Sequence, residues 1–268
     1  VQMVTINPAR YFGLKNRGAV APGYRADMVL VEDLVDFKIR EVFLEGRAVG
    51  EHSFQTNVKP PGNSIHIAEL SSTSFQIPAE GKKARVIEVI PGQIVTRHVF
   101  AEPIMRDGLA EADPDGDLAK LAVVERHGAT GNIGLGFVRG LGFKKCALAS
   151  TVAHDSHNLI VAGTNDEDML AAALEVRRMG GGLTAVHNGN VLASVPLPIA
   201  GLMSDKPLED VVAAMENLDK VCWSLGITHH SPFMILSFLA LPVIPELKLT
   251  DKGLVDVNRF ELVGLWAD

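Results

Sequence analysis

A series of short apolar segments, separated by proline, glycine and acidic turns, is the feature that most limits how this chain can fold. Beyond residue 75 these segments read KARVIEVI, IVTRHVFAE, LAKLAVVER, KKCALAS and NLIVAG. Each has the length and composition of a β-strand, and Pro91-Gly92 and the acidic turn EADPDGD separate the first three. The sequence therefore predicts several strands in this region.

Helical patterns lie after these segments. Thr164 and Glu167 form a capping box, and apolar side chains follow at helical spacing until Gly180, which suits a left-handed helix end. These side chains are Met169, Ala172, Ala173, Val176 and Met179. The segment LTAVHNGNVLASVPLP then predicts a hairpin about Asn188-Gly189-Asn190.

Two more helices are predicted toward the C-terminus. One has Pro207 in its first turn and Gly226 after its end. Its apolar face consists of Leu208, Val211, Val212, Met215, Leu218 and Cys222. The other begins at Ser231-Pro232, is apolar all round and therefore buried, and stops at Pro242. Strands and helices together predict an α+β domain over residues 75–268.

The N-terminal part follows a different pattern. Residues 1–16 predict a short helix with a turn, because Asn7-Pro8 suits a helix start. In residues 17–74, ADMVLV predicts a buried strand, FKIREVFLEGRAVG predicts a hairpin with its turn at Glu45-Gly46, and the stretch from His52 to Ser74 predicts a surface connection. Because Val1 is followed directly by an apolar segment without a leader, we expect the chain to be part of something longer.

Composition narrows the range of partners. The formal net charge is -7 and no block of lysine and arginine could neutralise a row of phosphates, which argues against nucleic acid. The longest apolar run, of about 12 residues from Pro232 to Val243, is too short to cross a membrane. Cys146 and Cys222 lie far apart in apolar segments, which predicts two buried thiols and a cytoplasmic protein.

The segment STVAHDSHNLIVAG contains the densest group of polar side chains. His154 and His157 could bind a metal or a substrate, with Asp155 or Asn158 orienting them. Alternatively, a strand end turns into a loop whose polar side chains satisfy backbone groups and one another. Ser156 could form a triad with His127 and Asp155, but no G-x-S-x-G turn supports it.

A second candidate is the segment ERHGATGNIGLG. Arg126 and His127 lie at the end of a predicted strand, and a glycine-rich turn follows them. The backbone amides of such a turn could donate hydrogen bonds to an anion. The turn would lead into NIGLGFVRGLG, which has a helix-like pattern. The spacing matches neither a dinucleotide fingerprint nor a phosphate loop. For the loop alone we expect a structural turn with a salt-bridged Arg126, and together with the histidine-rich loop it could form a joint polar pocket.

Several longer motifs resemble known families. NPARYFGL, GAVAPGYRADMVLVED and VFLEGRAVG resemble the exit from the catalytic barrel in the amidohydrolase superfamily, where the chain returns to complete a small β-sandwich. VERHGATGNIGLGFVRGLG, STVAHDSHNLIVAGTNDEDM, PLPIAGLMSD and FLALPVIPELKLTDKGLVDV together resemble the C-terminal domain of bacterial and archaeal adenine deaminases.

The resemblance implies a division of the chain and an activity. Residues 1–16 would be the last helix of a TIM-type barrel, residues 17–74 part of a composite β-sandwich with a linker, and residues 75–268 the C-terminal α+β domain. The activity implied is hydrolysis of adenine to hypoxanthine and ammonia. A divalent metal pair, manganese or iron, would be held in the barrel. The chain contains no His-x-His, so we expect neither catalytic residues nor metal ligands in it.

Three interpretations therefore stay open. In the first, the upstream barrel is the partner, and the loop from His154 to Asn158 packs toward its mouth with Arg126 and His127 to shape the adenine pocket; the same groups could instead brace the domain internally. In the second, the chain is a non-catalytic module that stabilises or oligomerises the barrel, through a surface that includes Val211, Met215 and Leu218. In the third, it is a self-contained metal-binding hydrolase that uses His127, His154, Asp155 and His157. We expect a homo-oligomer.

Overall fold

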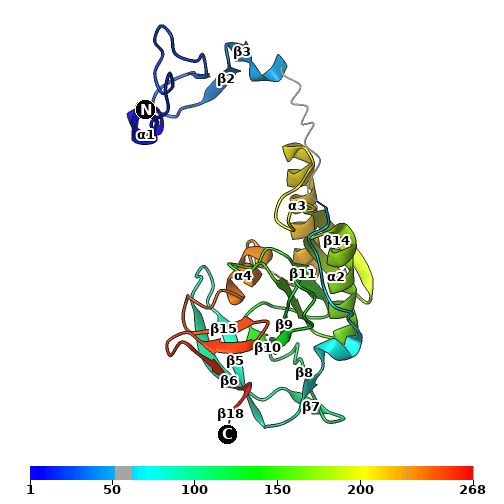
Figure 1. Ribbon diagram of the computed structural model, residues 1–268. Coiled ribbons are helices and arrows are strands. Elements are labelled where there is room, and N and C mark those ends of the chain that lie inside the picture. Colours follow the sequence, from blue (N-terminus) through cyan, green and yellow to red (C-terminus); the bar gives the residue numbers. More distant parts are fainter. Residues whose placement is uncertain (52–61, 228, 268) are drawn as a thin grey trace. The chain divides into compact units, whose positions relative to one another are not determined.

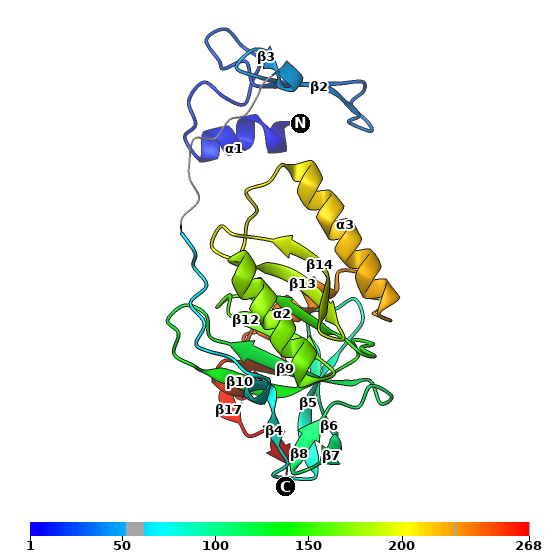
Figure 2. The same cartoon turned by 90° about the vertical axis from the view of Figure 1, so that its right-hand side faces the viewer.

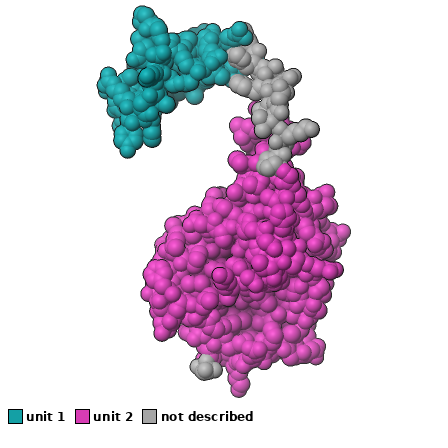
Figure 3. Space-filling view, viewed as in Figure 1, with its two compact units in different colours: residues 1–59 teal, residues 60–268 magenta. Residues whose placement is uncertain are grey.

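The computed structural model describes residues 1–51, 62–227 and 229–267. The chain divides into two compact units, Val1–Lys59 and Pro60–Asp268 (Figure 3). Of the predicted connection from His52 to Ser74, the first ten residues lie outside the described ones. Residues 62–74 belong to the second unit, and the His66 amide donates to the Arg126 carbonyl at 2.8 Å.

The first unit contains the predicted hairpin. Its elements are η1 (Gln2–Val4), α1 (Ile6–Tyr11), β1 (Met28–Val31), β2 (Ile39–Leu44), β3 (Arg47–Ala48) and η2 (Val49–Glu51). The strands form an antiparallel sheet in the order β1-β2-β3 (Figure 1). Glu45 and Gly46 make the turn between β2 and β3, both with positive φ, so the predicted hairpin is confirmed. The strand predicted in ADMVLV forms as β1, but the prediction that it is buried is wrong, because Val29 and Leu30 are exposed.

This unit has almost no core of its own. Among residues 1–50, Ala9 is the one buried residue, and it contacts the backbone near Gly18 closely enough that a Cβ there would lie 2.8 Å from the Ala9 Cβ. The apolar side chains of the strands are exposed instead, including Val29, Leu30, Ile39, Val42 and Leu44. A sheet with this much uncovered apolar surface needs other protein against it to be stable.

The second unit is built on a nine-stranded sheet. Its strands are β5 (Lys83–Val89), β6 (Thr96–Ala101), β9 (Leu118–Val124), β10 (Ile133–Arg139), β11 (Ala147–Ser150), β12 (Leu159–Gly163), β13 (Gly182–His187), β14 (Asn190–Pro196) and β18 (Trp266–Ala267). The order is β14-β13-β11-β12-β9-β10-β5-β18, with β6 also paired to β5. All pairs are antiparallel except β10 with β5.

Smaller elements complete this unit. Two three-stranded sheets consist of β4 (Ile77–Pro78), β7 (Ile104–Arg106) and β8 (Leu109–Glu111), and of β15 (Leu247–Thr250), β16 (Gly253–Asp256) and β17 (Glu261–Val263). The helices are η3 (Ser72–Phe75), α2 (Asp166–Met179), α3 (Leu208–Ser224) and α4 (Pro232–Leu239). In the described segments, no helix has both the length and the apolar composition for a membrane span. The α+β fold class is confirmed.

The large sheet is covered on both faces, because its central strands alternate between two cores. Ala122 and Val124 of β9 belong to a core with residues of α2 and η3, while Leu121 and Val123 belong to a core with residues of α3, α4 and the β15–β16 hairpin. Figures 1 and 2 show the sheet together with these helices. Side chains that point to opposite faces at alternate positions are the normal property of a strand. All seven residues of β9 are buried, as expected of a central strand.

The helix-like interpretation of NIGLGFVRGLG is wrong, because these residues form β10 between β9 and β5. The reason is packing against the β15–β16 turn. A Cβ on Gly134 would lie 1.8 Å from the Thr250 carbonyl oxygen, so only glycine permits this approach. The glycines of this segment let another backbone pass close to the sheet.

Two helix predictions also need adjustment. The helix α2 and its left-handed end at Gly180 are confirmed, but Asn165 is the N-cap and accepts from the Asp168 amide at 2.8 Å. The Thr164 hydroxyl instead lies 3.2 Å from the Cys146 amide, which donates to it. Helix α4 is buried on one side only, because the Met234 side chain is 53% exposed. The hairpin about Asn188-Gly189 is confirmed.

One charged side chain is enclosed in the core beneath the small sheet. Lys248 of β15 has no exposed surface, and its ammonium group donates to the Ile94 carbonyl at 3.1 Å. Burial lowers the pKa of Lys248 to about 8. A buried amine with one carbonyl acceptor is costly to keep charged.

Replacing this amine by an apolar side chain should stabilise the chain at neutral pH. The folded pKa of Lys248 lies below the ordinary 10.5, so protonation favours unfolding, and the free energy of unfolding rises as the pH increases from about 8 to about 10.5. We expect Lys248→Met to be about 2 kcal/mol more stable near pH 7 and to lack this rise. Urea unfolding over this pH range measures both effects, and parallel pH profiles for the two proteins would contradict them.

The close approach at β10 generates a second prediction. Gly134→Ala should destabilise the chain by about 2–3 kcal/mol, because the Thr250 backbone would have to move. Gly136→Ala on the same strand is the matched control, since its Cβ would meet Leu254 at 3.4 Å, and we expect a change below about 1 kcal/mol. Thermal or urea unfolding compares the two variants; equal losses would show that the contact with Thr250 is not the constraint.

Candidate functional site

The two polar segments singled out from the sequence meet at one end of the large sheet. Val124, the last residue of β9, pairs with Ile133 of β10 on one side and with Leu159 of β12 on the other. The loop after β9 and the loop before β12 therefore emerge side by side. We call the following residues the polar cluster: Ser64, Glu125, Arg126, His127, His154, Asp155, Ser156, His157, Asn158 and Asp251.

Arg126 lies at the centre of the polar cluster. It is 2% exposed, and its guanidinium donates to the carbonyl of His157, to that of Ala200 at 3.0 Å and to that of Ser64 at 3.5 Å. The predicted salt bridge is wrong, because all these acceptors are backbone carbonyls. A Cβ on Gly201 would lie 3.0 Å from this guanidinium, so glycine leaves room for it. Burial lowers the pKa of Arg126.

The glycine-rich turn after Arg126 already contains its own anion. The Glu125 carboxylate accepts from the Gly128 amide at 2.8 Å, from the Thr130 amide at 2.9 Å and from the Thr130 hydroxyl at 3.0 Å. Burial by itself would raise the pKa of Glu125, but these donors and the His127 amide lower it to about 2. The turn amides that could have bound an anion are therefore occupied.

The loop from His154 to Asn158 rests on α4. The His154 amide donates to the Ser237 carbonyl at 3.0 Å, and the His154 ring lies 5.0 Å from that of Phe238 and 5.7 Å from that of His157. Asp155 and Ser156 form an exposed tip. The Ser156 carbonyl lies 2.7 Å from the His127 Nε2, which bonds the two loops to each other.

Three atoms of the polar cluster are buried without a hydrogen-bond partner among the described residues: Ser64 Oγ, His157 Nδ1 and Asn158 Oδ1. Burial lowers the pKa of His157, and the nearby His154 and Arg126 lower it further, although Asp155 opposes them. The Nδ2 atom of Asn158 does have a hydrogen-bond partner, because it donates to Asp251 Oδ1 at 3.1 Å. Unpaired buried polar atoms are rare and need an explanation.

Ser64, Glu125 and Asp251 are members of the polar cluster that the sequence did not predict, and Asp251 is the most distant of them along the chain from the predicted residues. It lies in the turn between β15 and β16 and also accepts from Asn132 Nδ2 at 3.5 Å. The residues TDKG indicate a turn, but nothing in the sequence places that turn beside Asn158. The close approach of Thr250 to Gly134 brings it there.

The polar cluster does not provide a ligand set for a metal. Within residues 1–51, 62–227 and 229–267, no group of three or more histidine, cysteine, aspartate or glutamate side chains could hold an ion. The triad drawn from Ser156, His127 and Asp155 does not form either, because His127 bonds to the Ser156 carbonyl and not to its hydroxyl. The geometry therefore gives no support to a self-contained metal-binding hydrolase.

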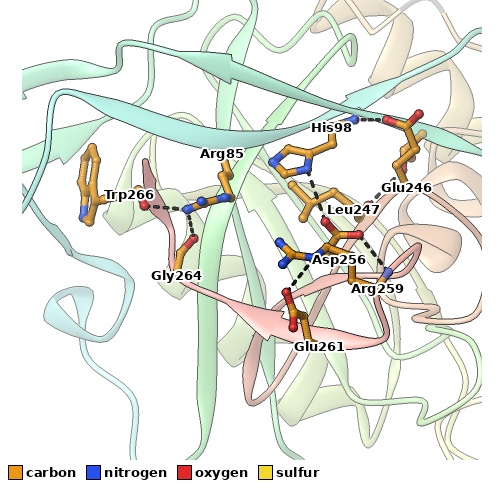
Figure 4. A network of polar contacts seen from close by, with 10 residues as sticks. Arg85, His98, Glu246, Leu247, Asp256, Arg259, Glu261, Gly264 and Trp266 are labelled. Carbon is orange, nitrogen blue, oxygen red and sulfur yellow. Dashed lines mark hydrogen bonds and ion pairs between the residues drawn. The ribbon is translucent and has the colours of Figure 1, made fainter. Parts of the chain in front are cut away.

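A second polar network lies away from this cluster (Figure 4). The His98 amide of β6 donates to the Glu246 carboxylate at 2.7 Å, and the His98 Nδ1 lies 4.0 Å from Asp256. Burial lowers the pKa of His98, while Asp256 and Glu246 raise it and Arg85 lowers it. These contacts join β6 to the β15–β16 hairpin, so His98 has partners that the sequence did not reveal.

A further pair of histidines lies beside an apolar cavity. His229 and His230 contribute to a cavity of about 390 Å³ that Met234, Ile235 and Phe238 of α4 also line. The His229 Nε2 lies 2.6 Å from the Gly140 carbonyl, which explains its position before the helix.

Removing the central guanidinium should loosen the polar cluster. Arg126→Ala leaves the carbonyls of Ser64, His157 and Ala200 without their donor, and we expect a loss of about 3 kcal/mol of stability with faster amide exchange over residues 153–158. Arg97→Ala is the control, because Arg97 forms an exposed pair with Glu88, and should cost less than about 1 kcal/mol. If Arg126→Ala unfolds like Arg97→Ala, these bonds do not hold the loops.

Comparison with known proteins connects this geometry to a family. The model of the adenine deaminase C-terminal domain matches residues 93–261, and that of the amidohydrolase family matches residues 1–49. Similar proteins include the adenine deaminase of Oleidesulfovibrio alaskensis, 55% identical over 100% of this chain and 47% of the relative. Adenine deaminase 2 of Carboxydothermus hydrogenoformans is 50% identical over 98% of this chain and 47% of its own length.

An adenine deaminase of Methanothrix thermoacetophila is 49% identical over 100% of this chain and 48% of its own length. The chain therefore spans about half the length of the curated relatives it matches. Both resemblances found in the sequence are confirmed. Since the match over residues 93–261 covers more than half of the chain, the chain belongs to the family of the adenine deaminase C-terminal domain.

Proposed function

We propose that this chain is the C-terminal part of an adenine deaminase, in which the whole protein hydrolyses adenine to hypoxanthine and ammonia in the cytoplasm. Identities of 45–55% to proteins named adenine deaminase support this activity. The relatives are about twice as long as this chain, so the proposal assigns the reaction to the whole protein.

The first unit supports a continuation into an amidohydrolase portion. Residues 1–49 match the amidohydrolase family, and the strands of this unit expose apolar side chains and have no buried residue. We infer that α1 is the last barrel helix and that β1, β2 and β3 complete a composite β-sandwich with strands from the rest of the protein. The metal pair, manganese or iron, then belongs to that portion, because the described residues of this chain do not fit such a site.

The unpaired buried atoms of the polar cluster are the observation that supports a role in binding the substrate. Three of the five such atoms among the described residues are on Ser64, His157 and Asn158; Arg126 bonds to the backbone carbonyls of Ser64 and His157, and Asn158 follows His157 in the chain. Each unpaired group costs free energy unless a ligand, a water molecule or another part of the protein bonds to it. A purine has both donors and acceptors along its edges, so the cluster is suited to hydrogen-bond one.

Six residues of the polar cluster then have defined tasks. Arg126 positions the loop through the His157 carbonyl, and His127 holds its exposed tip through the Ser156 carbonyl. Because its pKa is lowered, His157 is neutral at physiological pH and can offer one donor and one acceptor nitrogen. His154, Asp155 and Ser156 line the same loop and would close over the base and exclude water.

A second candidate function is a stabilising or oligomerising module. Helix α3 buries only Leu218 and Cys222 fully, while Leu208 is 73% exposed and Val212 is 46% exposed. An apolar stripe of this kind is suited to contact with the barrel or with a second copy in a homo-oligomer. In this alternative the polar cluster braces the domain and does not touch adenine.

Substitutions in the loop of a protein expressed at the full length of the relatives separate the two functions. His154→Ala and His157→Gln should lower kcat/KM for adenine about tenfold or more, since each removes a group that faces the base. Lys252→Ala, at an exposed position in the neighbouring turn, is the control. Unchanged kcat/KM in both histidine variants, with unfolding midpoints matching the parent, would favour the module over the pocket.

A further inference from the structure

The side chain of Asn158 is held in one orientation by Asp251. Asn158 Nδ2 lies 3.1 Å from Asp251 Oδ1, and Asn132 Nδ2 lies 3.5 Å from the other oxygen. An ionised carboxylate accepts hydrogen bonds and cannot donate them. The nitrogen of the Asn158 carboxamide must therefore face Asp251, and the carboxamide cannot turn over without losing this bond.

The oxygen of Asn158 consequently points away from Asp251 as an acceptor. Asn158 is 3% exposed, and its Oδ1 has no donor among the described residues. A partner for this atom must supply an N–H or O–H group. Two other members of the polar cluster, Ser64 Oγ and His157 Nδ1, also lack a partner among the described residues.

We propose that Asn158 Oδ1 accepts a hydrogen bond from the exocyclic amino group of adenine, and that Asp251 is the positioning residue that fixes this acceptor. The inference rests on the proposed function, in which the polar cluster lies at the adenine pocket. It adds a specificity-determining residue, Asn158, and a positioning residue in a different part of the chain.

An acceptor fixed at Asn158 would also affect how the product binds. Deamination replaces the amino group of adenine by the carbonyl oxygen of hypoxanthine, so a donor becomes an acceptor. Two acceptors would then face each other at Asn158, which disfavours the bound product. Fixing the carboxamide thus favours binding of the substrate over retention of the product.

Access to this acceptor requires the loop to move. Asn158 Oδ1 is covered, whereas Asp155 and Ser156 at the tip are exposed, and the tip bonds to His127 through one backbone carbonyl. In this proposal adenine enters when the exposed tip swings away and is enclosed when the tip returns.

Asp251→Asn in a protein of the relatives' full length tests the inference. An asparagine at this position both donates and accepts, so Asn158 can turn over and present its nitrogen to the ligand. The quantity to measure is the ratio of the inhibition constant for hypoxanthine to KM for adenine. We expect this ratio to fall about tenfold in Asp251→Asn and to stay unchanged in the control Lys252→Ala.

The possible results are distinct. An unchanged ratio in a folded Asp251→Asn protein overturns the inference, because it means that a water molecule or another group satisfies Asn158. If His157→Gln lowers kcat/KM while the ratio in Asp251→Asn is unchanged, the proposed pocket stands and only this inference fails. If neither variant changes any constant, the pocket itself is refuted.

A second variant keeps the test decisive if Asp251→Asn does not fold. Asn158→Leu has a similar volume and removes the acceptor, so it should raise KM for adenine about tenfold and change the hypoxanthine inhibition constant little. Equal weakening of both ligands in Asn158→Leu would overturn the inference. Thermal unfolding of each variant establishes that it is folded before its constants are compared.

Discussion

The arrangement of the polar end of the sheet depends on one buried guanidinium. Arg126 follows the central strand β9 and bonds to carbonyls from three segments that are far apart in the sequence, at Ser64, His157 and Ala200. A charge enclosed in this way is tolerable only when its donors are satisfied, and carbonyls can satisfy them without a neutralising carboxylate. The loops around it are therefore fixed by their backbones, which leaves their side chains free for other contacts.

A close backbone contact determines what faces this end of the sheet. The absence of a side chain at Gly134 lets the Thr250 carbonyl approach β10, and the next residue, Asp251, then reaches Asn158. The β15–β16 hairpin is thus both part of the core, through Leu247, Leu249 and Leu254, and a support for the polar cluster. Packing and site geometry both depend on the contact between β10 and the β15–β16 turn, so a substitution at this contact affects both.

The sequence was informative where a pattern is local. The hairpins at Glu45-Gly46 and Asn188-Gly189, the helix from Asp166 to Met179 and the strand from Leu118 to Val124 follow from turn residues and periodicity. The segment NIGLGFVRGLG was misread because its glycines serve a long-range approach to Thr250, which no local pattern records. The N-cap was misplaced by one residue, since Thr164 and Asn165 can both cap and tertiary contacts with Cys146 decide between them.

The candidate site, like the fold, could be predicted from the sequence only in its local features. The density of polar groups from His154 to Asn158 and the pair Arg126-His127 could be read directly, and the structure places them in contact. The carbonyl acceptors of Arg126, the carboxylate of Glu125 in its own turn and the approach of Asp251 depend on the three-dimensional arrangement. Residue type indicates which groups can bond, but their partners are set by how the strands pack.

The most direct test of the central claim is an experimental structure of a full-length protein containing this chain with a purine bound. We expect the purine within hydrogen-bond distance, about 3 Å, of Asn158 or His157. A purine bound with all its polar atoms contacting other residues, while the loop from His154 to Asn158 stays packed as it is here, would contradict this expectation.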